Sequence, residues 1–138
     1  MSSSTYDKLI AVLSYILAMF FPVPILSIVA VFLFWLVFRD QSRFIDHHLK
    51  ENINFQISFQ LYTLAAFILV FIFTNVLNML PQEMLPDLLA VSGFLMSVGL
   101  FGLLIFAGFA WYALLAAASI GALLGKFFKF PLIIRFVK

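Results

Sequence analysis

The chain has 138 residues, of which 65% are hydrophobic and 10% charged, and its formal net charge is +2. Soluble domains average roughly 45–50% apolar and about 25% charged residues, so this composition indicates a membrane protein. The basic residues do not form the long, aromatic-interleaved surface of a nucleic-acid-binding protein, which excludes nucleic acid as a partner. The absence of cysteine excludes disulfides, thiolate nucleophiles and thiolate metal sites.

The first predicted elements are two short apolar helices on either side of a proline pair. The sequence from Leu9 to Phe38 is almost continuously apolar, but Pro22 and Pro24 interrupt it. Proline removes a backbone donor and disfavours helix at the preceding residue, so two spans are expected, over residues 6–21 and 25–38. Both are shorter than the roughly 20 residues that cross a bilayer. They are expected to form a tight hairpin, with a re-entrant pair as the alternative.

Charged and apolar residues then alternate at helical spacing. Residues Arg39 to Glu51 hold three basic and three acidic side chains and both histidines, which predicts an amphipathic helix at the membrane interface. The apolar stretch at residues 55–73 predicts the third span, because nineteen residues give about 28 Å of helix. Polar and apolar residues alternate between Asn52 and Gln60. A lone strand in lipid would leave its backbone unpaired, so helix is expected there too.

An outer loop and a fourth span are predicted next. The segment from Asn75 to Asp87 contains two prolines and no lysine or arginine. The apolar run from Leu88 to Leu124 is too long for one straight span and too short for two spans with a turn. The fourth span is therefore placed at residues 98–120, after a tilted or surface-lying lead-in that bends at Gly93 and Gly99.

The chain ends in a tail of basic, aromatic and aliphatic residues, a composition that suits lipid headgroups. This tail and the Arg39–Lys50 connection hold seven of the eight lysines and arginines, whereas the outer loop holds none. Because these residues collect on the cytoplasmic side, both termini are expected in the cytoplasm. The sequence shows no arginine-rich, acid-poor stretch of an organelle transit peptide, so a bacterial inner membrane is expected. The expected lipid-headgroup contacts are Lys126, Lys129, Arg135 and Lys138.

These elements together predict an all-α integral membrane protein. It is expected to form a single transmembrane domain over residues 1–138, with four transmembrane helices, an amphipathic interfacial helix between spans two and three, and the basic-aromatic C-terminal tail.

Polar side chains on the third span are predicted to form two stripes. Amides are costly in hydrocarbon when unpaired, so such stripes mark either hydrogen bonds between helices or a path for conduction. Packing is the favoured interpretation. The first stripe consists of Asn52, Gln56, Gln60 and Thr63, and the second of Asn54 and Ser58.

Small residues recur at every fourth position along the fourth span. Such a seam lets another helix backbone approach closely, either within the chain or from another subunit. The expected partners are other membrane proteins or further copies of the chain, together with anionic lipids at the cytoplasmic face. The seam consists of Ala113, Ala117, Gly121 and Gly125.

Metal-type ligands cluster only at Asp46, His47, His48 and Glu51, where His47 and Glu51 are one helical turn apart. The rest of the chain supplies no further ligand, so no metal, cofactor or catalytic site is expected. No charged residue falls within a predicted span, and no phosphate loop or nucleophile elbow is present. The protein is therefore not expected to be an enzyme or an ion-coupled carrier.

Two motifs cover the middle and the end of the chain. The first is FRDQSRFIDHHLKENINFQISF at residues 38–59, and the second is GKFFKFPLIIRFVK at residues 125–138. Together they resemble a bacterial family of small four-helix membrane proteins that is similar to the Tic-twenty subunit of the chloroplast inner-envelope import translocon. The pattern residues are Phe44, Asp46, His48, Asn54, Phe55 and Gln56, with Gln60 one turn further on, and then Gly125, Lys126, Phe130, Pro131, Leu132, Arg135 and Phe136.

This resemblance implies a non-enzymatic membrane component, a scaffold or accessory subunit of a translocation or envelope assembly. One alternative is a self-assembled channel or translocation element that uses the first polar stripe. The least favoured alternative is a metal-dependent membrane enzyme centred on His47 and His48.

Overall fold

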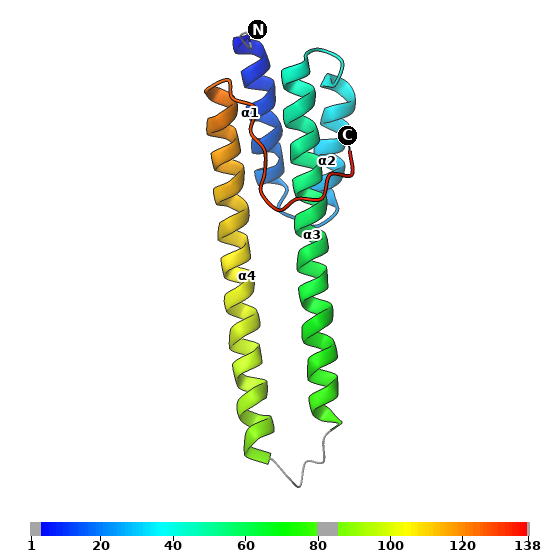
Figure 1. Cartoon of the computed structure of the whole chain (residues 1–138), viewed down its shortest axis with the longest axis vertical. Coiled ribbons are helices and arrows are strands. Elements are labelled where there is room, and N and C mark those ends of the chain that lie inside the picture. The colour runs from blue at the N-terminus through cyan, green and yellow to red at the C-terminus, as the bar shows by residue number, and fades with distance from the viewer. Residues whose placement is uncertain (1–3, 80–85, 138) are drawn as a thin grey trace. The chain divides into compact units, whose positions relative to one another are not determined.

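The computed structural model of the chain describes residues 4–79 and 86–137, and it contains no strand in those ranges. Its helices are α1 (Thr5–Phe20), α2 (Leu26–Phe38), α3 (Arg43–Asn78) and α4 (Pro86–Leu123) (Figure 1). The predicted all-helical fold is confirmed for the described residues, with four helices where four spans and an interfacial helix were predicted. Contacts divide the chain into two compact units, unit 1 at Met1–Gln60 and Trp111–Lys138, and unit 2 at Leu61–Ala110.

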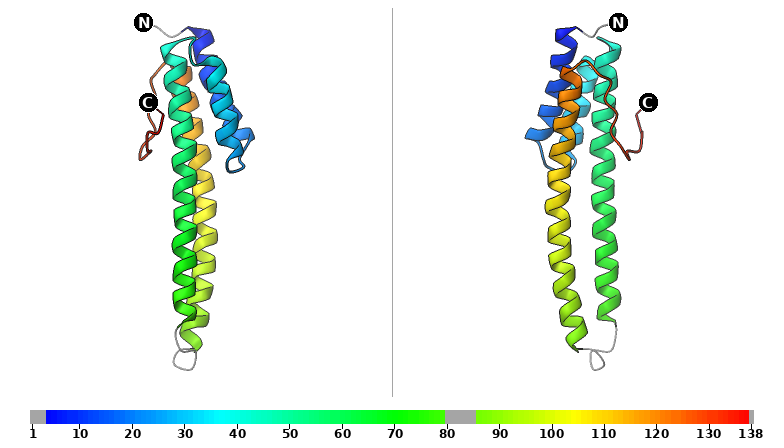
Figure 2. Two further views of the ribbon diagram at one scale, coloured as in Figure 1. Left: turned by 90° about the vertical axis from the view of Figure 1, so that its right-hand side faces the viewer. Right: turned by 60° about the vertical axis from the view of Figure 1, so that its left-hand side comes forward.

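The two prolines separate α1 from α2, as the sequence predicts. α1 begins at a capping box, in which Ser4 Oγ accepts from the Asp7 N–H and the Asp7 carboxylate accepts from the Ser4 N–H, both at 3.1 Å. The helix ends before Pro22, and α2 begins after Pro24. Ile25 joins them with a positive φ of 69°. The two helices pack against each other beside α3 (Figure 2).

α3 is one helix where two elements were expected. The division into an interfacial helix at Arg39–Glu51 and a separate span at 55–73 is wrong, because the sequence from Arg43 to Asn78 contains no proline or glycine that would end a helix. Its 36 residues make a helix about 54 Å long, more than the roughly 30 Å of the hydrocarbon core. α3 is therefore longer than one perpendicular crossing of the hydrocarbon requires.

α4 is likewise continuous over 38 residues. The separate lead-in and the bends expected at Gly93 and Gly99 are wrong, since the helix runs unbroken from Pro86 through the span predicted at 98–120. Proline is well accommodated at a helix start, where its missing N–H would have no helical partner. A Cβ added at Gly93 or Gly99 would meet no atom of the described residues within 4 Å. Neither position therefore needs glycine to make room for a neighbouring described residue.

Two helices are long and apolar enough to cross a membrane, over Arg43–Val76 and Val91–Leu123. The spans predicted at 55–73 and 98–120 lie on these helices. α2 is a shorter apolar helix, and α1 has 16 residues.

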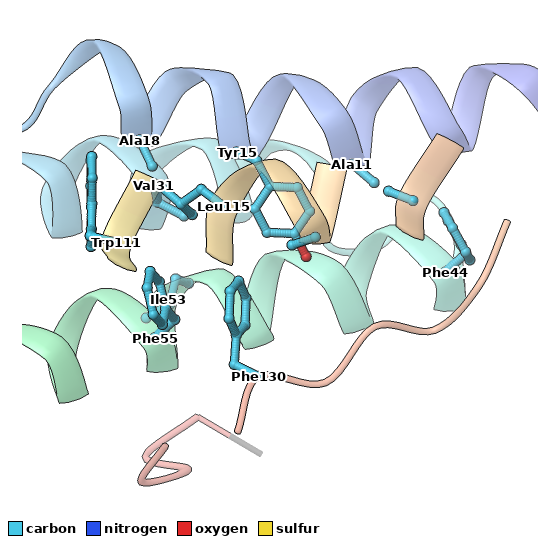
Figure 3. Packing of buried hydrophobic residues seen from close by; sticks show 12 residues of the cluster. Ala11, Tyr15, Ala18, Val31, Phe44, Ile53, Phe55, Trp111, Leu115 and Phe130 are labelled. Carbon is cyan, nitrogen blue, oxygen red and sulfur yellow. The ribbon is translucent and has the colours of Figure 1, made fainter. Parts of the chain in front are cut away.

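The buried core lies in unit 1, where all four helices and the tail contribute side chains (Figure 3). By contrast, the described side chains of residues 61–79 and 91–110 include no buried one. An apolar surface of this extent is expected where helices face lipid. The core residues are Ala11, Tyr15 and Ala18 of α1, Val31 of α2, Phe44, Ile53 and Phe55 of α3, Trp111, Leu115, Ala118 and Ala122 of α4, and Phe130 of the tail.

Candidate functional site

Buried polar side chains gather on the part of α3 that belongs to unit 1. Six of the eight buried polar residues lie between His48 and Ser58. Among the described residues, no fully buried side-chain nitrogen or oxygen lacks a hydrogen-bond partner. The α3 polar cluster, as we name this set, consists of His48, Glu51, Asn52, Asn54, Gln56 and Ser58.

The first predicted stripe joins α3 to its neighbouring helices. Asn52 donates from Nδ2 to the carbonyl of Ser14 on α1 at 2.9 Å. Gln56 donates to Asn52 Oδ1 at 3.4 Å and accepts at Oε1 from Trp111 Nε1 on α4 at 3.2 Å. These two amides therefore link three helices through buried hydrogen bonds.

Gln60 holds the strained junction between α1 and α2. Its Oε1 accepts from the Ile25 N–H at 2.9 Å, and its Nε2 donates to Ser27 Oγ at 3.0 Å. Positive φ is unfavourable for a β-branched residue, so a fixed acceptor for the Ile25 N–H stabilises this turn. Thr63, the last residue of the stripe, lies in unit 2.

Both ring nitrogens of His48 have partners. Nδ1 lies 2.8 Å from the Tyr15 hydroxyl, and Nε2 lies 3.1 Å from the Lys126 carbonyl. Because a carbonyl only accepts, we assign the hydrogen to Nε2 and a donated Tyr15 hydrogen bond to Nδ1. His48 thus connects α1 to the start of the tail. Its neighbour His47 connects to the same segment, with Nε2 2.9 Å from the Phe128 carbonyl.

The second predicted stripe holds the tail by its main chain. Asn54 Oδ1 accepts from the N–H groups of Phe136 and Val137 at 2.9 and 2.8 Å, and Asn54 Nδ2 donates to the Val137 carbonyl at 2.9 Å. Ser58 Oγ accepts from the Ile134 N–H at 2.9 Å and donates to the Ile134 carbonyl at 3.2 Å. The two side chains thus supply the hydrogen-bond donors and acceptors that a neighbouring β-strand would supply to the tail backbone.

Glu51 anchors the middle of the tail. Its buried carboxylate accepts from the Phe130 N–H at 3.2 Å and from Arg135 Nε at 3.1 Å. The Phe130 side chain is 3% exposed and stacks on Phe55, with ring centroids 4.2 Å apart. One charged pair and one aromatic pair therefore fix the tail against α3.

The start of α3 has its own polar contact with α2. Asp46 Oδ1 accepts from Trp35 Nε1 at 2.9 Å, and Asp46 forms an ion pair with Lys50 at 2.6 Å. The centroids of the Phe44 and His48 rings are 4.5 Å apart. All the predicted motif residues of α3 thus lie in or beside the polar cluster; they are Phe44, Asp46, His48, Asn54, Phe55, Gln56 and Gln60.

The side chains predicted as possible metal ligands each bind a different partner within the protein. His47 meets a backbone carbonyl, His48 joins Tyr15 to the tail, and Glu51 holds the tail. Within residues 4–79 and 86–137, no group of three or more histidine, aspartate or glutamate side chains could hold a metal ion.

The seam residues occupy different environments. Ala113 and Ala117 are exposed. A Cβ added at Gly121 would lie 3.3 Å from Phe128 Cβ, so this glycine leaves room for the tail. Gly125 has a φ of 72° and ends α4 in the left-handed conformation that helix C-termini favour. The residues through which α4 packs into the core are Trp111, Leu115, Ala118 and Ala122.

The predicted lipid-contacting cations are also placed differently from one another. Lys126 and Lys129 are exposed. Arg135 is half-exposed while it pairs with Glu51. Lys138 lies outside the described residues.

The main partners of the cluster were not singled out from the sequence. They include Ser14, Tyr15, Trp111 and the tail backbone. One signal in the sequence could have located the tail. Pro131 prevents a continuous helix there, so backbone groups of the tail need hydrogen-bond partners. Asn54 and Ser58 need hydrogen-bond partners as well, so the two sets could pair with each other.

Comparison with known proteins identifies a family. The family model described as the magnetosome magnetite crystal formation protein family (MamF/MmsF) matches residues 6–137. No curated protein and no solved structure matches the chain.

This match corrects the family resemblance drawn from the two motifs. The resemblance to proteins similar to the Tic-twenty subunit is wrong, and so are the function it implied, a subunit of a translocation assembly, and the alternative of a translocation channel. The physical reason is that the motif residues make contacts within the fold: His48, Asn54 and Phe55 hold the tail, and Asp46 and Gln56 bind neighbouring helices. They describe how the fold is maintained, and they carry no information about the assembly in which it works.

Proposed function

We propose that this protein, which belongs to the magnetosome magnetite crystal formation protein family, is a helical protein of the magnetosome membrane and takes part in the formation of magnetite crystals. The observation that carries the proposal is the extent of the match. Residues 6–137 include all four described helices except Thr5, the α3 polar cluster and the tail. Two helices of sufficient length and apolar character to cross a bilayer support the membrane location.

The proposed orientation places both termini and the Arg39–Lys50 connection on the cytoplasmic side, with the Asn75–Asp87 segment on the opposite side. The distribution of lysine and arginine supports this orientation. We propose that α1 and α2 enter the same membrane as a short pair. Their large exposed apolar side chains support this, because in water such a surface would be unfavourable.

The proposed mode of action is binding rather than catalysis. His47, His48 and Glu51 are occupied by contacts that maintain the fold, which supports a non-enzymatic role. Other membrane proteins or further copies of the chain are the proposed partners, and the exposed Ala113 and Ala117 suit close helix contact. Anionic lipids are proposed to contact the basic side chains of the tail.

The location is tested by fractionating a magnetotactic bacterium that produces an epitope-tagged copy of the chain. We expect the tagged protein to be enriched in isolated magnetosomes relative to a resident protein of the cytoplasmic membrane, which serves as the control. A protein that stays entirely with the cytoplasmic membrane, while a native magnetosome protein fractionates normally, would contradict the proposal.

A further inference from the structure

The C-terminal tail, residues 126–137, runs along α3 and turns back on itself (Figures 1 and 2). It begins beside His48, advances to Ser58, and returns to Asn54. His48 and Ser58 are ten residues apart on a helix, so the tail advances about 15 Å along α3. Ser58 lies close to Leu61, where α3 becomes mainly apolar. The far end of the tail is therefore held at Ser58, near the end of the part of α3 that belongs to unit 1.

The turn at the far end presents an exposed apolar residue in an unfavourable conformation. Pro131 and Leu132 form the turn, and Leu132 has a φ of 57° and is 90% exposed. Glycine, asparagine and aspartate usually occupy such positions in turns that face water. A bulky residue at positive φ calls for an explanation. Further large apolar side chains of the tail are exposed as well, namely Phe127, Ile134 and Phe136.

Several backbone groups of the tail have side-chain partners on α3. Irregular backbone enters hydrocarbon only where the protein itself satisfies its polar groups. Glu51, Asn54 and Ser58 accept hydrogen bonds from tail N–H groups, and Asn54 and Ser58 also donate to tail carbonyls. These polar side chains stand on a helix that is itself a candidate membrane span. The tail thus directs these hydrogen bonds toward α3, and part of its apolar side chains, namely Phe127, Leu132, Ile134 and Phe136, are exposed on its other side.

We propose that residues 126–137 form a re-entrant segment whose turn at Pro131–Leu132 lies among the lipid acyl chains, with Lys126 and Lys129 at the headgroups of the same leaflet. Acyl chains are the occupant that the structure favours, because the exposed apolar side chains lie alongside a candidate spanning helix. The proposal rests on the membrane location and not on the role in magnetite formation.

The test uses the natural absence of cysteine. Leu132→Cys and, as the matched control, Lys129→Cys each provide one exposed labelling site in the same tail. Each purified variant carries a polarity-sensitive fluorophore and is reconstituted in phosphatidylcholine–phosphatidylglycerol vesicles, with and without acyl-brominated lipid. We expect brominated lipid to quench the label at position 132 several-fold more strongly than the label at 129. We expect aqueous iodide to show the opposite preference.

Equal iodide quenching at the two positions would overturn the proposal, since the turn would then lie in water. If position 132 is shielded from iodide but loses this shielding when the protein is diluted into excess lipid, the proposal is also overturned. The turn would then be covered by a second copy of the chain and not by acyl chains. Circular dichroism of each labelled variant checks that the helices are retained. Adding Asn54→Leu to the position 132 variant should weaken the quenching by brominated lipid, because the tail loses hydrogen bonds to α3. These measurements use purified protein, so they are independent of the outcome of the magnetosome fractionation.

Discussion

Asn54 makes three hydrogen bonds to two consecutive residues of the tail, although it stands at the edge of the segment predicted to cross the membrane. Its side-chain amide has the same donor and acceptor groups as a peptide bond, so it replaces the missing strand partner of the tail. Where water is scarce, an unpaired backbone group costs far more than it does in solution. Asn54 therefore contributes to the position of the end of the tail, beside Ser58 and Glu51.

We predict that Asn54→Leu lowers the free energy of unfolding in detergent by about 1–3 kcal/mol, because the Phe136 and Val137 N–H groups lose their acceptor. Asn75→Leu is the matched control, since the exposed Asn75 side chain donates to the Phe71 carbonyl of its own helix. Its effect should stay within about 0.5 kcal/mol. Chemical unfolding followed by circular dichroism measures both. Equal losses in the two variants would show that the tail contacts of Asn54 do not contribute.

The sequence identifies the polar residues of α3 but not their partners. Amides at helical spacing next to an apolar segment indicate hydrogen bonds between elements. Asn52 and Gln56 make buried ones, and Gln60 makes one at the junction of α1 and α2. The contact between Tyr15 and His48 depends on the rotation of α1 about its axis, which no local pattern reveals. The same holds for a tail that follows α3 without any secondary structure of its own.

At the scale of the elements, the breaks between helices follow local chemistry. Pro22 and Pro24 separate α1 from α2, as expected. α3 was divided wrongly because a change from charged to apolar residues is a change of environment and does not end a helix. α4 was shortened wrongly because isolated glycines cost only about 1 kcal/mol each in a helix and do not break it.

The end of α4 provides a prediction about the seam. We expect Gly121→Leu to destabilise the protein by about 1–3 kcal/mol, because its Cβ would lie 3.2 Å from Phe128 Cδ2 and would displace the tail. Leu123→Ala, at an exposed position on the same helix, should cost less. Thermal aggregation in mild detergent compares the two. A Gly121→Leu protein as stable as the wild type would show that the close approach of Gly121 to Phe128 does not contribute to stability.

At the scale of the whole molecule, unit 1 is a bundle whose core contains apolar side chains and the α3 polar cluster, and unit 2 is a pair of apolar helical segments. The sequence predicts the membrane as the solvent and helix as the only secondary structure, since both follow from composition. It does not predict magnetite formation. The histidines and carboxylates that suggest chemistry serve the fold, and the family match supplies the biological role.

Orientation is a property of the whole molecule, and reporter fusions test it. Reporters placed after Lys138 and within Arg39–Glu51 should be cytoplasmic, and a reporter between Asn75 and Asp87 should be exported, because lysine and arginine are concentrated on one side. Activities of paired alkaline phosphatase and green fluorescent protein fusions measure this. An exported C-terminal reporter would refute a topology with both termini in the cytoplasm.

The role in mineral formation is tested most directly by complementation. The chain is introduced into a magnetotactic bacterium that lacks its own member of the family, and crystal diameters are measured by electron microscopy. We predict that the wild-type chain shifts the diameters toward those of the parent strain. The Asn54→Leu variant should shift them less, and Asn75→Leu should match the wild type. Crystals that remain unchanged, although the wild-type chain is present in the magnetosome membrane at the level of the native protein, would contradict the proposed role.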